Sequence, residues 1–187
     1  CIPTGSTPST HIFKLPLGLV GNMRFDMHDS VENEWLCAQV LTAFGLPVAP
    51  CTMQSFEDQK VLVVERFDRR VWGGHQLLRL PQEDMCQALG VSPILKYESD
   101  GGPGVDRIMA LLNGSQHRER DRFRFFKAQL LFWMLCATDG HAKNFSIFLQ
   151  PQGEYEMTRR YAVVSASPLR GAGPGKLSPH KARMAMA

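Results

Sequence analysis

The stretch FRFFKAQLLFWMLCA, residues 123–137, constrains the fold of this chain more than any other. It is apolar nearly all round a helix, which predicts a central buried helix that begins near Arg118. The polar stretch ATDGHAKNF, residues 137–145, follows directly. An acid, an imidazole, an amine and a carboxamide lie together at the end of a buried helix. Burying such groups costs free energy, so they are either a structural feature that the fold must compensate or a reaction centre.

The composition indicates a folded protein without a membrane segment. With 187 residues and 44% hydrophobic content, the chain can form one ordinary domain or two lobes of a small one. No apolar run reaches the ~18 residues that a membrane span needs, and no signal-peptide pattern is present, so we expect a cytoplasmic protein. The cysteines are odd in number and form no C-x-x-C pair, which favours reduced thiols over disulfides or zinc. They are Cys1, Cys37, Cys51, Cys86 and Cys136.

The charge is distributed unevenly along the chain. From residue 157 to residue 187 there is no acidic residue, whereas the stretch carries six basic ones: Arg159, Arg160, Arg170, Lys176, Lys181 and Arg183. A basic tail of this kind can bind nucleic acid, although it lacks interleaved aromatic residues. The chain begins with Cys rather than Met and stops abruptly, so we expect a piece of a longer protein.

The first half of the chain predicts a small mixed unit. Alternating apolar residues in THIFKLPL predict a strand over residues 10–17, ended by Pro16. Residues 30–45 have helical periodicity, with Asp29 or Ser30 as the cap. Residues 60–70 predict a buried strand that turns polar at Glu65. In the helix predicted over residues 30–45, we expect Leu36, Val40 and Phe44 to face inward.

The second half predicts mainly helices. We expect a short helix over residues 82–89, a loop over 95–104, a helix over 103–114 and the central helix from Arg118. The segments FSIFLQ and YEMTRRYAVVSA flank a turn and predict a hairpin. This order predicts an α+β protein with two lobes, residues 1–68 and residues 69–187, which meet near Phe67 and Asp68.

Within the polar stretch, Asp139 and Asn144 form the pattern D-x-x-x-x-N. This is the spacing of a phosphotransferase catalytic loop, in which the Asp accepts a hydroxyl proton and the Asn holds magnesium. Lys143 could neutralise the moving phosphoryl group, and His141 could orient the loop. The pattern alone is also compatible with a simple helix end, where the same residues form a turn and offset the helix dipole.

Two further features extend the phosphotransferase hypothesis. Lys14 is a lone cation in an apolar strand, where a lysine for nucleotide phosphates would lie, and its partner on the following helix could be Glu32 or, better, Glu34. The backbone of Glu65–Phe67 could pair with an adenine edge at the lobe junction. Each feature also has an ordinary structural explanation. Lys14 could be a lysine on an edge strand, and residues 65–67 could be a simple strand exit.

The sequence resembles a known family, the HipA serine/threonine kinase toxins of bacterial toxin–antitoxin modules. The resemblance covers nearly the whole chain through the segments STHIFKLP, SVENE, VERFDRR, LLRLPQEDMCQALG, KYESDGGPG and ATDGHAKNFSIF. It implies a two-lobed protein-kinase-like fold in which Asp139 is the proton acceptor and Lys14 contacts the ATP phosphates. The remaining residues that it implies for binding ATP and Mg²⁺ are Glu65, Arg66, Phe67, His141, Lys143, Asn144 and Tyr161, with Asn144 as the metal ligand.

The resemblance also implies partners for the chain. The family phosphorylates a protein serine, and an aminoacyl-tRNA synthetase is the known class of target. A helix-turn-helix antitoxin of the HipB type neutralises the kinase and brings it to operator DNA. We therefore expect a protein substrate, an antitoxin and an indirect contact with DNA.

The chain departs from the family pattern at two places. The family's Gly-rich phosphate loop has no counterpart ahead of Lys14, where PTGSTPST is too short. The acidic metal ligand that follows a Tyr after the late hairpin is replaced, since Tyr161 is followed by Ala162. Glu154 and Glu156 are expected at the hairpin turn, pointing to solvent, and would not substitute for the missing ligand.

Three hypotheses follow. The chain is an impaired kinase of HipA type, a non-catalytic pseudokinase-like fragment that only binds the antitoxin or DNA complex, or a DNA-associated subunit that acts through its basic tail.

Overall fold

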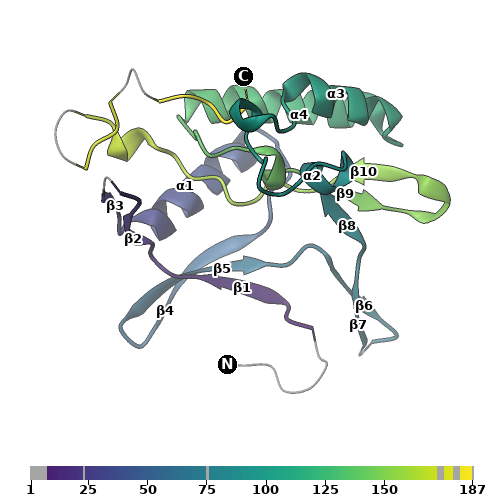
Figure 1. Cartoon of the computed structure of the whole chain (residues 1–187). Helices are drawn as coiled ribbons and strands as arrows, with labels where there is room; N and C mark the ends of the chain where they lie inside the picture. The colour runs from purple at the N-terminus through teal and green to yellow at the C-terminus, as the bar shows by residue number, and fades with distance from the viewer. Residues whose placement is uncertain (1–7, 23, 75, 172–174, 179–181, 187) are drawn as a thin grey trace.

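The computed structural model describes residues 8–22, 24–74, 76–171, 175–178 and 182–186. In it the chain folds into helices and small antiparallel sheets. The predicted α+β class agrees with this mixture of elements (Figure 1). The helices are α1 (Ser30–Ala43), α2 (Met85–Ala88), α3 (Val105–Leu111) and α4 (Arg118–Met134). The strands are β1 (His11–Lys14), β2 (Gly18–Val20), β3 (Phe25–Met27), β4 (Cys51–Phe56), β5 (Gln59–Glu65), β6 (Arg69–Trp72), β7 (Gln76–Arg79), β8 (Gln82–Asp84), β9 (Ser146–Leu149) and β10 (Tyr155–Met157).

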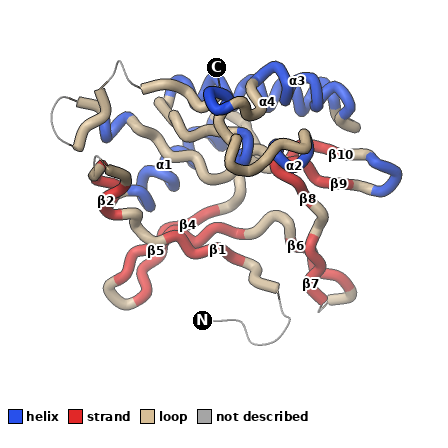
Figure 2. Tube along the Cα trace, in the orientation of Figure 1, coloured by secondary structure: helices blue, strands red, loops and turns tan. Residues whose placement is uncertain are grey.

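Two three-stranded antiparallel sheets position the rest of the chain. In the first sheet the order is β1-β5-β4, with Lys14 opposite Leu62, and α1 packs on it. In the second sheet the order is β10-β9-β8, with Asp84 opposite Ser146. Figure 2 shows the first sheet at one end of the molecule and most of the helices at the other. The pairs β2-β3 and β6-β7 are separate hairpins.

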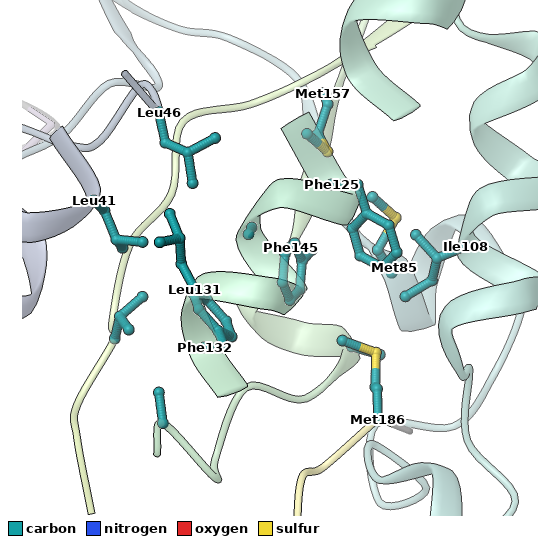
Figure 3. Packing of buried hydrophobic residues seen from close by; sticks show 14 of the residues in the cluster. Leu41, Leu46, Met85, Ile108, Phe125, Leu131, Phe132, Phe145, Met157 and Met186 are labelled. Atoms are coloured by element: carbon teal, nitrogen blue, oxygen red, sulfur yellow. The ribbon is translucent and has the colours of Figure 1, made fainter. Parts of the chain in front are cut away.

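The buried apolar side chains form two clusters. The smaller cluster contains Val31, Ala49, Leu62 and Val64, from α1 and the first sheet. The larger cluster lies around α4, and Figure 3 shows part of it, including Phe125, Phe132 and Phe145. Because Cys37 and Leu41 of α1 belong to the larger cluster, α1 links the two. The division of the chain at residue 68 stays a prediction.

The segment after β10 runs back beside the segment that precedes β4. The Ala49 N–H donates to the Arg160 carbonyl over 2.9 Å, and the Arg160 N–H donates to the Pro47 carbonyl over 2.7 Å. The Arg160 side chain is fully buried, with its guanidinium 4.6 Å from the centre of the Phe145 ring. The next residues contribute to both apolar clusters, since Tyr161 packs against the smaller one and Val163 belongs to the larger one.

The helix over residues 30–43 is confirmed, but its buried face was predicted wrongly. The residues that pack inward are Val31, Cys37, Ala38 and Leu41. Leu36 and Phe44 are 58% and 50% exposed, and Val40 is half-buried. Asp29 occupies the N-cap position without a side-chain hydrogen bond, and the Ser30 hydroxyl accepts from the Leu17 N–H instead. Neither side chain therefore caps the helix as predicted.

The central helix α4 is confirmed, but it is not buried all round. Phe125, Leu131 and Phe132 face the core. The opposite side exposes large apolar residues: Phe123, Phe126, Leu130, Trp133 and Met134. An apolar composition on every side cannot show which side faces the core, so the sequence overestimated the burial.

Two other segments and one side chain also differ from the prediction. Residues 82–84 are strand β8 rather than the first turn of a helix, because they pair with β9. The late hairpin is confirmed, but its second strand ends at Met157. Glu156 does not point to solvent, because its carboxylate accepts from Arg120 Nη2 at 2.6 Å. Glu154 is exposed, as predicted.

The cysteines within the described residues are free thiols, as expected: Cys37, Cys51, Cys86 and Cys136. Cys1 and, in the basic tail, Lys181 lie outside the described residues. No helix in the described part of the chain is long and apolar enough to cross a membrane.

The two sides of α4 should respond differently to truncation. We expect Phe132→Ala to lower the free energy of unfolding by about 3–5 kcal/mol, because the ring is 1% exposed and packs on Phe145. Phe123→Ala on the same helix is the matched control and should change it by about 0.5 kcal/mol or less, because that ring is 64% exposed. Urea unfolding measures both, and equal losses would contradict the assignment of the exposed face.

Candidate functional site

The loop after α4 is held at both ends by the core. Ala137 and Phe145 are buried, and the Ala137 N–H donates to the Phe132 carbonyl over 2.8 Å. A Cβ at Gly140 would lie 2.3 Å from the Phe132 ring, so only glycine lets the loop cross this ring. The polar residues between these anchors therefore have little freedom in where they point.

Asp139 is the exposed member of the loop, with 69% of its side chain accessible. Its Oδ1 accepts a hydrogen bond of 2.6 Å from the Tyr97 hydroxyl and lies 4.0 Å from His141 Nε2. Burial raises the pKa of Tyr97 to about 12, and the hydrogen bond to the Asp139 carboxylate adds to that rise. The phenol therefore remains a donor at neutral pH.

His141 is buried at the base of the loop. Its backbone N–H donates to Asn144 Oδ1 over 3.1 Å, and the Asn144 N–H donates to the His141 carbonyl over 2.9 Å. Burial lowers the pKa of the imidazole, and the negative charge of Asp139 partly offsets this by raising it. Nδ1 of the ring is buried without a hydrogen-bond partner. The backbone of His141, rather than its ring nitrogens, thus makes the hydrogen bonds that shape this turn.

Lys143 points toward strand β8. Its Nζ lies 2.7 Å from Asp84 Oδ2, and this hydrogen bond raises the pKa of the lysine. The other oxygen of Asp84 caps α2 through the Gln87 N–H. The Lys143 carbonyl accepts from the Tyr161 hydroxyl over 3.0 Å, and that hydroxyl also bonds the Ser146 hydroxyl. The cation is therefore held by a carboxylate that sequence reasoning did not identify.

Asn144 faces the position where the predicted metal ligand is missing. Its Nδ2 lies 3.4 Å from the Ala162 carbonyl. Ala162 has φ +53°, a left-handed conformation in which Asn and Asp are enriched and which strains other residues with a Cβ. Among the described residues no group of three His, Cys, Asp or Glu side chains could hold a metal ion. One neutral amide oxygen beside an alanine does not fit a firmly held Mg²⁺, which prefers carboxylate ligands.

Lys14 pairs with Glu34, the helix partner preferred from the sequence. The Lys14 Nζ lies 2.5 Å from Glu34 Oε1 at the end of β1. Glu32, the alternative partner, pairs with Lys60 instead. A cavity of about 570 Å³ adjoins the pair and is lined by Leu15, Leu17 and Ser30 among others. The strand lysine is therefore both paired and next to open space.

At the strand exit, residues 65–67, the backbone N–H groups of Glu65 and Arg66 are both paired. The Glu65 N–H donates to the Pro50 carbonyl over 2.8 Å, and the Arg66 N–H donates to the Thr10 carbonyl over 2.9 Å. Proline has no N–H, so Pro50 cannot return a hydrogen bond to the Glu65 carbonyl. The Phe67 ring packs 5.7 Å from the Tyr161 ring.

Asp68, immediately after this exit, forms ion pairs with the neighbouring arginines. Its carboxylate is 4% exposed and accepts from Arg66 Nε and Nη2 at 3.1 and 3.0 Å and from Arg69 Nη1 at 2.6 Å. Burial opposes the charge, but the hydrogen bonds from Arg66 and the charges of Arg66 and Arg69 lower the pKa of Asp68. The Arg66 side chain is thereby turned into the protein.

The residues of the candidate site line separate cavities. Glu34, Tyr161 and Ala162 line a small one of about 10 Å³. Since Glu34 holds Lys14 and Ala162 bonds Asn144, this cavity joins the lysine strand to the polar loop. Asp139 contacts a different groove, of about 250 Å³, together with Tyr97 and Ser99.

Sequence reasoning missed Tyr97, Asp84 and Asp68. For Asp84 a signal existed, because D-x-x-Q is the pattern of a capping box, and one is present here. Tyr97 and Asp68 carry no comparable local pattern.

Comparison with protein families gives one match over almost the whole chain. The family described as HipA-like C-terminal domain matches residues 3–187. The protein named "Putative kinase Y4mE" from Sinorhizobium fredii is 34% identical over 94% of this chain and 41% of its own length. The serine/threonine-protein kinase toxin HipA from Shewanella oneidensis is 32% identical over 86% of this chain and 38% of its own length. The chain thus spans about two-fifths of these curated relatives.

Solved structures give the same picture. A complex of HipA, HipB and operator DNA from Shewanella oneidensis matches with a TM-score of 0.77 and 29% identity, over 96% of this chain and 41% of that one. The Helicobacter pylori proinflammatory kinase CtkA matches with a TM-score of 0.58 and 13% identity, over 81% of this chain and 50% of that one. The second match shows a kinase-like fold alone.

The Asp68 cluster generates a prediction about stability and pH. Asp68→Asn should lower the free energy of unfolding at pH 7 by about 2–4 kcal/mol, because it leaves buried arginine groups short of a charged acceptor. The folded-state pKa of Asp68 is lowered, so its stabilisation is present above the unfolded pKa of about 3.9 and is lost as pH falls through the folded value.

Urea unfolding between pH 7 and pH 3 tests this prediction. The gap between the native chain and the Asp68→Asn variant should be constant down to about pH 5 and should narrow below about pH 4. The control is Asp58→Asn, an exposed acid in the turn between β4 and β5. A difference in the free energy of unfolding that does not change with pH would show that the charge of Asp68 does not stabilise the fold.

Proposed function

The chain belongs to the family of HipA-like C-terminal domains, and from this premise we propose that it is the phosphoryl-transfer portion of a HipA-type serine/threonine protein kinase whose activity is impaired by Ala162. The two-lobed arrangement, the roles of the site residues, the nucleotide, the metal and the partners are all part of this proposal.

The observation that carries the proposal is the joining of two distant segments at one cavity. Lys14 reaches it through Glu34, and the polar loop reaches it through Asn144 and Ala162. A phosphotransferase needs this neighbourhood, because the lysine holds phosphates while the loop supplies the base and the metal ligand. A simple helix end would not need to lie beside a cavity that the partner of a strand lysine also lines.

In this proposal ATP binds at the strand exit. The Glu65 carbonyl would accept from the adenine amino group and the Phe67 N–H would donate to the ring, while Arg66 is held aside by Asp68. Lys14, fixed by Glu34, would contact the phosphates across the open space beside it. His141, Lys143 and Tyr161 would shape the floor of the site through their contacts with Asn144, Asp84 and Ser146.

Asp139 would accept the proton of the substrate hydroxyl. It is the exposed carboxylate of the loop and, among the described residues, is in no ion pair with a lysine or arginine, which suits a base. Magnesium, when held by such a site, neutralises the phosphate charge. Here Asn144 offers one neutral oxygen and Ala162 offers none, so we assign no step to the metal.

Ala162 also supports a second candidate function. A pseudokinase-like portion would keep the fold and a nucleotide or partner surface without transferring phosphate. Since Lys14 and Glu34 form the expected pair, the site in this proposal has lost one ligand rather than its architecture.

The partners are proposed from the relatives. HipA from Shewanella oneidensis was solved with HipB and operator DNA, and we infer an antitoxin of the HipB type for the whole protein, with DNA contacted through it. The substrate would be a protein serine, with an aminoacyl-tRNA synthetase as the expected class, in the cytoplasm.

Nucleotide binding can be tested before any assay of transfer. ATP at about 100 times its dissociation constant should stabilise the folded chain by roughly 2.7 kcal/mol and raise its melting temperature. In the native chain we expect magnesium to add little to this rise, because Ala162 supplies no ligand. In the Ala162→Asp variant magnesium should increase it, and the variant should fold because Asp tolerates the left-handed backbone. No rise with ATP in either chain would refute nucleotide binding.

Asp139 can be tested in the Ala162→Asp background. Asp139→Asn should reduce phosphoryl transfer from ATP to a protein substrate by at least about 100-fold, because the amide cannot accept the hydroxyl proton. The rise in melting temperature with ATP should be unchanged. Asp106→Asn, an exposed acid on α3, is the control and should transfer normally. Equal transfer by the Asp139→Asn variant would rule out its role as the base.

A further inference from the structure

We propose that Tyr97 is a positioning residue for Asp139, whose hydroxyl fixes one carboxylate oxygen and leaves the other for the hydroxyl of the substrate. This inference rests on the function proposed above. It gives a role to the segment KYESDGGPG, which sequence reasoning treated only as a loop.

The first argument is the contact itself. The Tyr97 hydroxyl donates to Asp139 Oδ1 over 2.6 Å, a short bond of the kind made to a charged acceptor. His141 Nε2, at 4.0 Å from the same oxygen, is too distant to form a hydrogen bond. Within the described part of the chain, the phenol is therefore the hydrogen-bond donor that restrains this exposed carboxylate. Without it, the side chain of Asp139 could rotate among several conformers.

The second argument is that Tyr97 is itself held firmly. Its ring packs edge-on against the His141 ring, with centres 5.2 Å apart and planes at 82°. The carbonyl of the preceding residue, Lys96, accepts from the Ala142 N–H over 3.2 Å. The N–H of the following residue, Glu98, donates to the Ala185 carbonyl over 3.2 Å. The phenol is thus anchored to the same loop that carries Asp139.

The third argument comes from the glycines of this segment. The Gly102 N–H donates to the Tyr97 carbonyl over 2.9 Å. A Cβ at Gly102 would lie 2.1 Å from the Leu95 carbonyl oxygen and 2.6 Å from that of Tyr97. Both oxygens belong to the backbone, so no movement of a side chain could relieve the clash. Gly101 has φ +89°, in the left-handed region that glycine favours. These glycines let the chain turn tightly back on Tyr97, so they contribute to its placement.

The fourth argument is the chemistry of the phenol. Burial and the neighbouring carboxylate raise the pKa of Tyr97 to about 12, so it keeps its proton at neutral pH and cannot act as the base. In the transfer step the substrate oxygen bonds to the γ-phosphorus, the bond to ADP breaks, and the proton passes to Asp139. Tyr97 keeps its own proton throughout and acts only through the orientation of Asp139.

The groove beside this pair indicates where the substrate enters. It has a volume of about 250 Å³ and is lined by Tyr97, Ser99, Thr138 and Asp139 on one side and by residues 183–185 on the other. A serine side chain entering there would meet the Asp139 carboxylate next to the phenol. We therefore assign the substrate side of Asp139 to this groove.

The kinetic test uses the Ala162→Asp chain as the parent. Tyr97→Phe should lower kcat by about 10- to 100-fold and leave KM for ATP within about 2-fold, because misplacing a catalytic group slows the chemical step without weakening nucleotide binding. Tyr155→Phe is the matched control, since its hydroxyl donates to the Leu111 carbonyl, and it should transfer at the parent rate. A Tyr97→Phe variant that transfers as fast as the parent would overturn the inference.

A second measurement needs neither nucleotide nor activity. In the native chain with ¹³C at the tyrosine ζ carbons, Asp139→Asn should shift the Tyr97 resonance, assigned by its loss in Tyr97→Phe, and leave Tyr155 and Tyr161 unmoved. An unmoved Tyr97 resonance overturns the contact and the inference with it. A parent that transfers no phosphate to any protein substrate refutes the proposed function instead, and removes the catalytic part of the inference with it.

Discussion

The burial of Phe145 is the interaction on which the arrangement of the polar loop depends. Its ring is fully buried, 5.0 Å from the ring of Phe125 and 5.6 Å from that of Phe132, and the Arg160 guanidinium lies over it. Burying a Phe side chain stabilises a fold by roughly 1.5–3 kcal/mol, far more than one exposed hydrogen bond. The core therefore fixes the end of the loop, and hydrogen bonds then set the directions of Asp139 and Asn144. The same ring holds residue 160, which carries Tyr161 and Ala162 toward the first sheet.

Because the core places the loop, each charged group of the region can be satisfied by a nearby partner. Lys14 is paired with Glu34, Lys143 with Asp84, and Asp68 with arginines. A buried charge without a partner would cost several kcal/mol, so such pairing lets the site form before any ligand is bound. Asp139 differs, since its donor is a neutral phenol and most of its surface is exposed. It is the carboxylate in this region that is best placed to act on something outside the protein.

Local patterns in the sequence predicted α1, α3, α4, β1, β5 and the late hairpin, but not the short strands β2, β3, β4, β6, β7 and β8 or the contacts between loops. The pairing of Lys14 with Glu34 was predicted and is present, but the prediction assumed that Leu36 faces inward, whereas Leu36 is exposed. The exposed face of α4 was not, since Phe123 and Phe125 are equally apolar and only the packing of the chain distinguishes them. Residues 82–84 became a strand because pairing with β9 outweighed their helical pattern. Tyr97 meets Asp139 across 42 positions through loops that have no periodicity.

In the proposed function, the alanine at position 162 affects the chemistry of the site and leaves its fold intact. The contacts of Ala162 that hold the site together are made by its backbone, whose carbonyl meets Asn144 Nδ2. An Asp there would add a carboxylate for a metal without altering that contact, and it suits the left-handed conformation better than Ala does. In the proposed function the side chain at this position would therefore serve the chemistry and not the fold. The chain with Ala162 keeps the Lys14–Glu34 pair and the Tyr97–Asp139 contact.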